Sequence, residues 1–496
     1  MNAIPSTAHG DGSGGQPAAA RVVVVGAGIA GLAAAAAVRR DRPDVEVVVL
    51  EASDRVGGKL RLQEVGGTTV DVGAESILAR RPEGVALAEA SGLADRIVHP
   101  ATTVARIWSR GQLRRMPRSV LGVPVDSKEL AESGLLSRRG LARAAMDTML
   151  PPTDIGDSDV SVGWLIEERF GRELLDRLVE PLLGGVYAGH ARELSARAAA
   201  AQVVALMDKD RSLMKAAAAT LDARPAAGPV FAGIDGGVGL LPAAVASGVT
   251  GPSLDVRLRT TVRDLERTAD GRWRVVTGPA VAPEVLTADA VVVATPAAPG
   301  SRLLAGCAPD AAAELGRMEY ASMAVVTLAF TAETFPEVTG SGFLVPPVEG
   351  RRVKAATFSF QKWDWVRRSS PDLRLMRTSL GRHREEHELQ VPDEELVERS
   401  LLDLADAVGL AVRPVDWHVQ RWGGGLPQYA VGHPDRVRRI RASVAGVPGL
   451  AVCGAVYDGL GIPACIAGAE VAAADVLRQL PSPARGPLAR RETMEP

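Results

Sequence analysis

Three glycines near the amino terminus, Gly26, Gly28 and Gly31, have the spacing of a dinucleotide-binding turn. Gly26 permits a tight turn, Gly28 leaves room for a pyrophosphate against the backbone, and Gly31 lets a helix pack closely on a strand. The residues between them are small or apolar: Ala27, Ile29 and Ala30. The pattern predicts that backbone N–H groups at a helix start bind the phosphates of a nucleotide cofactor.

An acidic residue follows at the distance expected for ribose recognition. Glu51 closes the apolar run 45–50, twenty positions after Gly31, and a carboxylate there accepts both hydroxyls of an adenosine ribose. This favours a free 2′-hydroxyl and argues against NADP. A buried strand at 22–25, an alanine-rich helix at 29–40 and a second strand at 45–50 are the elements that must position these groups.

A second glycine pair distinguishes FAD from NAD. Gly57 and Gly58 lie between the cations Arg55 and Lys59, shortly after Ala52. The pair lets more backbone approach an extended cofactor, and the cations can neutralise its phosphates. With this extension the chain resembles the flavin-dependent amine oxidase superfamily. The resemblance implies FAD, held noncovalently.

Composition limits the other classes of function. At 496 residues, two or three domains are expected. The 57 basic residues nearly balance the 59 acidic ones, which argues against a nucleic-acid partner. Three cysteines, Cys307, Cys453 and Cys465, have neither a disulfide framework nor metal-ligand spacing, so no metal site is predicted and a reducing cytoplasm is expected.

The segments predict an α/β fold: a Rossmann-type FAD-binding domain assembled from discontinuous pieces, an α+β substrate-binding domain and a mainly helical insertion. A buried strand within 288–297 and a glycine-rich turn before an alanine-rich helix within 450–477 would complete the nucleotide domain. The predicted parts are a disordered tail at 1–20, FAD-binding pieces at 21–99, 211–300 and 441–480, the insertion at 100–210, the substrate domain at 301–440, and a flexible tail at 481–496.

Five later segments narrow the resemblance to the protoporphyrinogen and coproporphyrinogen oxidases, over roughly residues 20–480. These segments are 73–81 (GAESILARR), 180–189 (EPLLGGVYAG), 357–363 (TFSFQKW), 421–433 (RWGGGLPQYAVGH) and 457–468 (YDGLGIPACIAG). The last two are the most specific, because other amine oxidases keep the glycines but not P-Q-Y with G-H.

The resemblance implies roles along an extended FAD. Lys59 and the segment Gly73, Ala74, Glu75 and Ser76 would lie near the ribityl chain or the flavin. Val262, in a predicted strand, would meet the adenine through its backbone, or is simply a core residue of that strand. The isoalloxazine would be bordered by Trp422, Gly454, Gly461, Ile462 and Pro463. Trp422 has the alternative of filling an interface between lobes.

The implied activity is the FAD- and oxygen-dependent, six-electron oxidation of coproporphyrinogen III to coproporphyrin III, with release of hydrogen peroxide, in haem biosynthesis. Arg80 and Arg81 would bind propionates, or are solvated surface residues. An apolar rim would come from Met323, Phe343, Leu344 and Phe358, which are alternatively ordinary core. No catalytic residue is nominated, and His190, which replaces the aspartate usual in the family, is expected to be a surface histidine.

Several alternatives stay open. Protoporphyrinogen IX has two propionates instead of four, and the arginine-rich helical lobe favours coproporphyrinogen and the bacterial coproporphyrin III-forming type. An amine oxidase acting on an alkyl amine or polyamine would need a lysine near the flavin, and Lys354 is its best candidate. A flavoprotein without turnover is a third possibility.

The chain has no apolar run that fits a membrane span better than a nucleotide-binding unit. A basic amphipathic stretch at 135–149 would make the protein peripheral on the inner face of the cell membrane, or is a core-facing helix with a solvated basic face. Besides the porphyrinogen and molecular oxygen, the resemblance implies hand-over of the product to a ferrochelatase.

Overall fold

The valine-rich runs form a five-stranded parallel sheet, as the sequence predicts. Its order is β12 (Leu254–Arg257), β2 (Glu46–Leu50), β1 (Arg21–Val25), β16 (Ala290–Val293) and β22 (Leu450–Val452). The strands come from three distant parts of the chain, so the nucleotide-binding unit is discontinuous. The inner strands β2, β1 and β16 are buried on both faces and need no polar alternation, which explains why they are almost wholly apolar.

The two faces of this sheet bury alternate residues of each strand. Val22 and Val24 face a core formed with α1 (Ile29–Asp41), α11 (Leu241–Val249) and α18 (Ile462–Leu477). Val23 and Val25 face a second core. That core contains β13 (Asp264–Arg267), β14 (Trp273–Thr277), β15 (Glu284–Ala288), α12 (Ala297–Leu304), α13 (Pro309–Gly316) and α17 (His433–Ala445).

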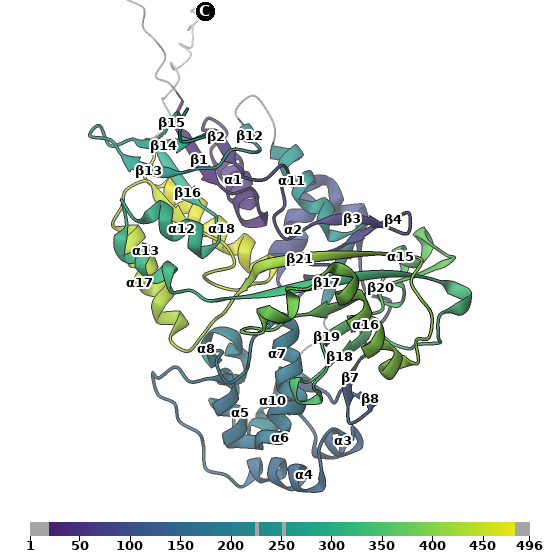
Figure 1. Ribbon diagram of the computed structural model, residues 1–496. Coiled ribbons are helices and arrows are strands. Elements are labelled where there is room, and N and C mark those ends of the chain that lie inside the picture. The colour runs from purple at the N-terminus through teal and green to yellow at the C-terminus, as the bar shows by residue number, and fades with distance from the viewer. Residues whose placement is uncertain (1–18, 224–227, 250–253, 482–496) are drawn as a thin grey trace, which may run out of the picture.

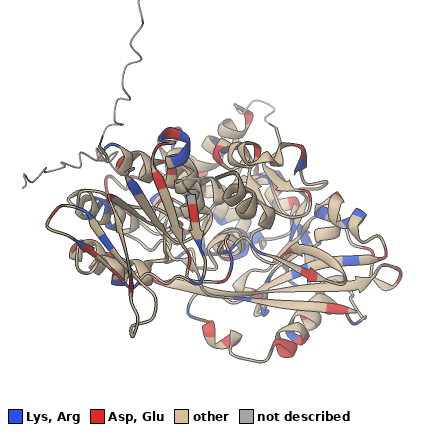
Figure 2. Ribbon diagram, turned by 90° about the horizontal axis from the view of Figure 1, so that it is seen from above, with Lys and Arg blue, Asp and Glu red and all other residues tan. Residues whose placement is uncertain are grey.

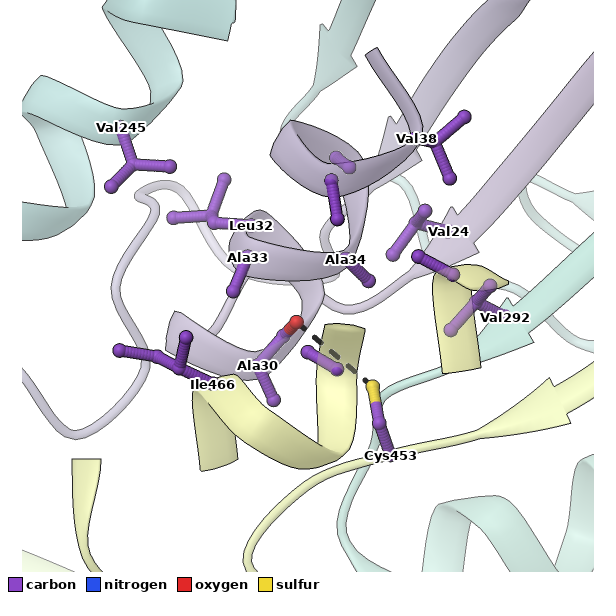
Figure 3. Close-up of a cluster of buried hydrophobic side chains, with 14 of the residues drawn as sticks. Val24, Ala30, Leu32, Ala33, Ala34, Val38, Val245, Val292, Cys453 and Ile466 are labelled. Atoms are coloured by element: carbon purple, nitrogen blue, oxygen red, sulfur yellow. Dashed lines mark hydrogen bonds between the residues drawn. The ribbon is translucent and has the colours of Figure 1, made fainter. Parts of the chain in front are cut away.

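Helix α1 is buried along most of its length because it packs between the sheet and α18. Its alanines allow this close approach, since they carry little side chain and lose no rotamer freedom. Ala30 of α1 and Ile466 of α18 meet in the shared core (Figure 3).

A second, seven-stranded sheet carries the remaining long strands. Its order is β21 (Asp416–Pro427), β17 (Tyr320–Thr331), β20 (Leu373–Leu380), β19 (Val353–Thr357), β18 (Gly342–Leu344), β7 (Ala105–Ser109) and β8 (Gln112–Arg115). Helix α16 (Asp393–Val408) packs on one face, with Leu396, Val397 and Leu404 in the shared core. Strands β17 and β21 cross the middle of the molecule, between the nucleotide-binding unit and the helical lobe (Figure 1).

The helical lobe has its own core and a buried ion pair. Its helices are α3 (Ser127–Glu132), α4 (Arg138–Ala145), α5 (Val162–Phe170), α6 (Arg172–Leu174), α7 (Glu180–Tyr187), α8 (Ala196–Ala199), α9 (Ala201–Met207) and α10 (Leu213–Asp222). Arg169 and Asp147 pair at 2.6 Å and are almost wholly buried. Asp147 also accepts hydrogen bonds from the Ser212 hydroxyl and two backbone N–H groups of α10, so the pair ties α5 to α10.

Smaller elements connect these units. They are the hairpin β3 (Leu62–Val65) and β4 (Thr68–Asp71), the strands β5 (Ile77–Leu78), β6 (Ile97–Val98) and β11 (Phe231–Ile234), the pair β9 (Ser119–Val120) and β10 (Val123–Pro124), and the helices α2 (Pro82–Ala88), α14 (Ser359–Lys362) and α15 (Asp364–Ser369).

The computed structural model describes residues 19–223, 228–249 and 254–481, so the tails predicted at 1–20 and 481–496 lie almost entirely outside the described residues. Two predicted boundaries shift. The insertion expected to be helical from 100 begins with β7 and β8, which pair with the substrate-domain sheet. Helix α10, assigned by sequence to the second FAD-binding piece, packs in the helical lobe. Local patterns cannot reveal such long-range packing partners.

Candidate active site

The predicted phosphate-binding turn at 26–31 (the phosphate turn) has three glycines, and only the second leaves space for an added Cβ atom. Gly26 has φ of +104°, and a Cβ there would lie 3.0 Å from the Ala294 carbonyl oxygen. A Cβ on Gly31 would overlap the Gly26 carbonyl oxygen. A Cβ on Gly28 would meet no described atom within 4 Å. The open space therefore lies in front of Gly28 and the start of α1, where a pyrophosphate must approach.

Glu51 anchors the acidic side of this turn. Its carboxylate accepts hydrogen bonds from the backbone N–H groups of Ala27 and Ser53, both at 2.8 Å. A carboxylate has about four acceptor positions, so capacity remains for ribose hydroxyls. Ala52 is exposed beside it.

Val262 lies outside the strand in which the sequence placed it. It belongs to the extended connection between β12 and β13 and is half-buried. This connection begins beside the ribose-binding turn, because the Thr260 N–H donates to the Glu51 carbonyl at 2.7 Å. The backbone N–H groups of Arg259 and Arg263 also donate within the protein, so contact between the Val262 backbone and the adenine stays a prediction.

The glycine pair after Glu51 packs against the phosphate turn. The Gly57 N–H donates to the Ala27 carbonyl at 2.8 Å, and Gly28 and Gly57 form a β-bridge. Arg55 donates to the Gly58 carbonyl at 2.7 Å and to the Val56 carbonyl at 3.2 Å. Arg55 thus holds the loop in shape, whereas the sequence assigned it to the phosphates.

Lys59 and Gly73 join the turn to the second sheet. A Cβ on Gly73 would overlap the Lys59 carbonyl oxygen and lie 3.3 Å from the Trp422 ring. The Trp422 indole N–H donates to the Val72 carbonyl at 3.2 Å. The exposed Lys59 side chain makes no ion pair with any described residue. These contacts bring three predicted site residues together.

Two cations that the sequence reading missed hold the 73–76 loop. Lys362 donates to the Glu75 carboxylate at 2.6 Å and to the Ser76 hydroxyl at 3.0 Å. Arg377 pairs with Glu75 at 3.2 Å and donates to the Gly73 carbonyl at 2.8 Å. Burial raises the pKa of Glu75, but the positive charges of Arg377 and Lys362 together lower it by more, so the net shift of the pKa is downward. Glu75 therefore acts as an anchor, and Ala74 remains exposed.

The third stretch approaches from the start of α18. Pro463 stands in its first turn after Gly461 and Ile462, and a Cβ on Gly84 of α2 would lie 3.3 Å from Pro463. Gly454 has φ of +127° and nothing within 4 Å of an added Cβ among the described residues. This turn is rigid, narrow and open on one side, as a flat ring needs beside it.

The two most specific sequence segments pack on each other. Tyr429 donates to the Ala455 carbonyl at 2.7 Å, and its ring stacks on His433 at 4.0 Å. The His433 Nε2 atom lies 3.1 Å from the Tyr457 carbonyl. Burial lowers the pKa of His433, which favours the neutral imidazole as the donor. These residues join β21 to the α18 turn, a role that sequence reading did not assign.

Strand register separates the predicted apolar rim into two groups. Met323 pairs with Trp422, and both lie on the face of the large sheet away from α16, as does Leu344. Phe343 and Phe358 point to the other side, where they are 2% and 1% exposed in the core and their rings contact each other. The prediction that these two rings belong to the apolar rim around the substrate is therefore wrong, because they fill the core shared with α16.

The remaining predicted residues have mixed positions. Arg80 is exposed, whereas Arg81 pairs with Glu83 at 2.7 Å just before α2. His190 is half-buried, and its carbonyl accepts hydrogen bonds from the next turn. Lys354 is 3% exposed, and its ammonium donates to the Gly381 carbonyl at 2.9 Å, away from the phosphate turn.

The family model of flavin containing amine oxidoreductases matches residues 29–477. The chain belongs to this family. FAD is accordingly its cofactor. The open space at Gly28 and the free acceptor capacity of Glu51 suit its phosphates and its ribose. The described residues contain no group of histidine, cysteine and acidic side chains arranged to hold a metal ion.

Named relatives within this flavin family are similar along nearly the whole chain. A coproporphyrinogen III oxidase from Mycobacterium tuberculosis (strain ATCC 25618 / H37Rv) is 37% identical over 468 residues, covering 92% of this chain and 97% of that protein. A protoporphyrinogen oxidase from Macaca fascicularis is 28% identical, with 93% and 99% covered. A solved structure from Exiguobacterium sp. 255-15, described as a protoporphyrinogen oxidase, has a TM-score of 0.81 at 32% identity, with 93% and 99% covered.

Proposed function

We propose that this protein catalyses the six-electron oxidation of coproporphyrinogen III to coproporphyrin III, with FAD as cofactor and molecular oxygen as final acceptor. The greater identity to the named coproporphyrinogen III oxidase than to the protoporphyrinogen oxidase carries the choice of substrate. Lys354 does not suit the role that the amine-oxidase alternative gives it, because its ammonium donates to the Leu380 and Gly381 carbonyls.

We propose that an apolar wall, formed by Met323, Leu344 and Trp422 on one face of the large sheet, receives the flat macrocycle. A Cβ on Gly185 of α7 would lie 3.5 Å from Leu344 of β18, yet Gly185 itself is exposed. The next residue, Val186, is 55% exposed, and Met323 and Trp422 continue the same sheet face. An apolar wall of this kind orients the ring and excludes water.

FAD, when bound, accepts two electrons at a time, so three rounds remove six electrons. The protein's part is to hold a meso carbon of the macrocycle towards the cofactor while pyrrole N–H protons leave. Aromatisation supplies much of the driving force. No described side chain is therefore assigned as a general base.

The propionates need cations at the edge of this apolar wall. Arg80 suits that role, because it is exposed and makes no ion pair with a described residue, whereas Arg81 is already paired with Glu83. Lys59, whose carbonyl packs against Gly73, is a second exposed candidate. Four propionates would use such cations more fully than two.

Anaerobic mixing of the FAD-loaded protein with each porphyrinogen tests the proposal. We expect coproporphyrinogen III to bleach the flavin absorbance and to yield porphyrin fluorescence, and air to restore the flavin with hydrogen peroxide release. Protoporphyrinogen IX should react more slowly, and an alkyl amine should not react. A faster reaction with protoporphyrinogen IX would reverse the substrate choice, and no bleaching by either would reject turnover.

None of the described helices is long and apolar enough to span a membrane. We propose a peripheral contact through the predicted amphipathic stretch, of which Leu135 and Leu136 are buried in the lobe core while Met146 and Met149 are 41% and 69% exposed. Co-sedimentation with anionic vesicles should fall when both methionines are changed to serine. Unchanged sedimentation would contradict it. The porphyrin product has the chemistry of a ferrochelatase substrate, so hand-over to such an enzyme completes the proposal.

A further inference from the structure

A small cavity of about 30 Å³ lies at the end of β20, beside α16 and away from the phosphate turn. Its charged lining residues are four arginines, Arg351, Arg352, Arg382 and Arg399, and two glutamates, Glu385 and Glu388. A buried water needs roughly 10–15 Å³ of such space. The cavity therefore has room for about two waters, or for one oxyanion group of a few heavy atoms.

Arg382 lines this cavity, and Lys354 contacts two of the lining residues; both of these buried cations lack a close counter-charge. Arg382 is 6% exposed, and its guanidinium makes only long contacts, 3.4 Å to the Val345 carbonyl and 3.5 Å to the Arg351 carbonyl. Its nearest described carboxylate is Glu385, at 3.8 Å. Lys354 is 3% exposed and donates to the Gly381 and Leu380 carbonyls, both belonging to cavity-lining residues. No described carboxylate pairs with it.

The other acids nearby are already engaged by the outer arginines. Glu388 pairs with Arg352 and with Arg399. Asp403 and Asp406 both pair with Arg351. The inner cations Lys354 and Arg382 consequently repel each other in a region of low dielectric, which is costly without an anion.

The pKa values show the same imbalance. Burial, and then the charge of Arg382, lowers the pKa of Lys354 to about 7. Burial also lowers the pKa of Arg382, although Glu385 opposes this shift. An anion between the two groups would raise both pKa values and so favour the charged form of Lys354.

We propose that this cavity is a binding site for a small oxyanion, a carboxylate or inorganic phosphate, held by Arg382 and Lys354. The guanidinium can bind two oxygens side by side, and the ammonium has a third N–H beyond the two that donate to carbonyls. The site is separate from the apolar wall formed by Met323, Leu344 and Trp422.

The test uses the FAD-loaded full-length protein. At constant ionic strength, inorganic phosphate replacing chloride should raise the melting temperature with one-site saturation, and calorimetry should give a matching dissociation constant. Lys354→Met should weaken this binding at least tenfold. Arg399→Gln, a less buried change, should weaken it at least threefold. The control Lys128→Met, at an exposed lysine paired with Glu132, should leave it unchanged.

Two outcomes would overturn the site. No saturable response in the unchanged protein would mean that waters alone fill the cavity. Equal phosphate binding by the Lys354→Met, Arg399→Gln and unchanged proteins would place the anion elsewhere. A parallel titration with coproporphyrin III identifies the source of the oxyanion: porphyrin affinity that falls with both Lys354→Met and Arg399→Gln, but not with Lys128→Met, would assign a propionate, and unchanged affinity a free ion.

Discussion

Gly28→Ala should abolish tight FAD binding while leaving the protein folded. Gly28 has φ of −68°, which alanine adopts without strain, and its added methyl would meet no described protein atom within 4 Å. The only fold penalty is alanine at the N-cap of α1, about 0.5–1 kcal/mol. The methyl would instead occupy the space that the pyrophosphate needs.

The size of the loss follows from the contacts that a displaced phosphate gives up. Moving it away from the α1 start removes about one charge-assisted hydrogen bond, worth about 1.5–3 kcal/mol. The helix dipole contributes about 0.3–1 kcal/mol more. A total of about 2–4 kcal/mol corresponds to an FAD dissociation constant about 30- to 1,000-fold higher.

Gly31→Ala is the matched control, because its methyl would overlap the Gly26 carbonyl oxygen and disturb the α1–β1 packing itself. Apoproteins of both variants would be titrated with FAD by flavin fluorescence and unfolded thermally. We expect a near-normal melting temperature only for Gly28→Ala. Normal FAD affinity in Gly28→Ala, or apoprotein melting as low as that of Gly31→Ala, would refute the proposed position of the pyrophosphate.

Three other perturbations have defined outcomes. Arg169→Met should destabilise the protein by about 3–5 kcal/mol in urea unfolding, because Asp147 would keep a buried unpaired charge; a loss below about 1 kcal/mol would contradict this. In chloride buffer, Lys354→Met should stabilise more at pH 6 than at pH 10, because the folded pKa of about 7 lies below the unfolded value near 10.4. The penalty is full below pH 7 and fades as pH rises towards 10.4, so a pH-independent effect would oppose it. Glu75→Gln should weaken FAD binding about tenfold and change the flavin spectrum, since Lys362 loses its carboxylate partner. An unchanged spectrum would contradict the expectation that the 73–76 loop lies beside the flavin.

The phosphate end of the site could be predicted from sequence because its requirements are local. The spacing of Gly26, Gly28 and Gly31 fixes a turn, and the strand and helix beside it follow from short apolar runs. Glu51 follows at the end of the next strand for the same reason. Each of these residues lies within one βαβ unit, so no distant contact was needed to place them.

The substrate side was only partly predictable. Phe343 and Leu344 were both expected at the apolar rim around the substrate. Neighbours in a strand point to opposite faces of the sheet, so at most one of the two could face the substrate. Lys362 and Arg377 could not be found, because each meets Glu75 across about 300 positions of sequence. Their charges are visible in the sequence, but the pairing depends on how the sheet docks on the nucleotide-binding unit. Charged residues of both signs are interspersed over the described ribbon, so charge alone does not mark the site (Figure 2).

Cofactor identity and substrate choice therefore depend on different kinds of structural information. The turn at 26–31, with open space at Gly28, is where we expect the FAD phosphates to bind, and its geometry is set within one short segment of the chain. The apolar wall depends on the register of β17, β18 and β21. A slip of one residue would turn Met323 and Leu344 to the opposite face of the sheet and expose core residues. Tyr429 and His433 pack the end of β21 against the α18 turn. We expect these contacts to help hold the register of β21 and, with it, the position of Trp422.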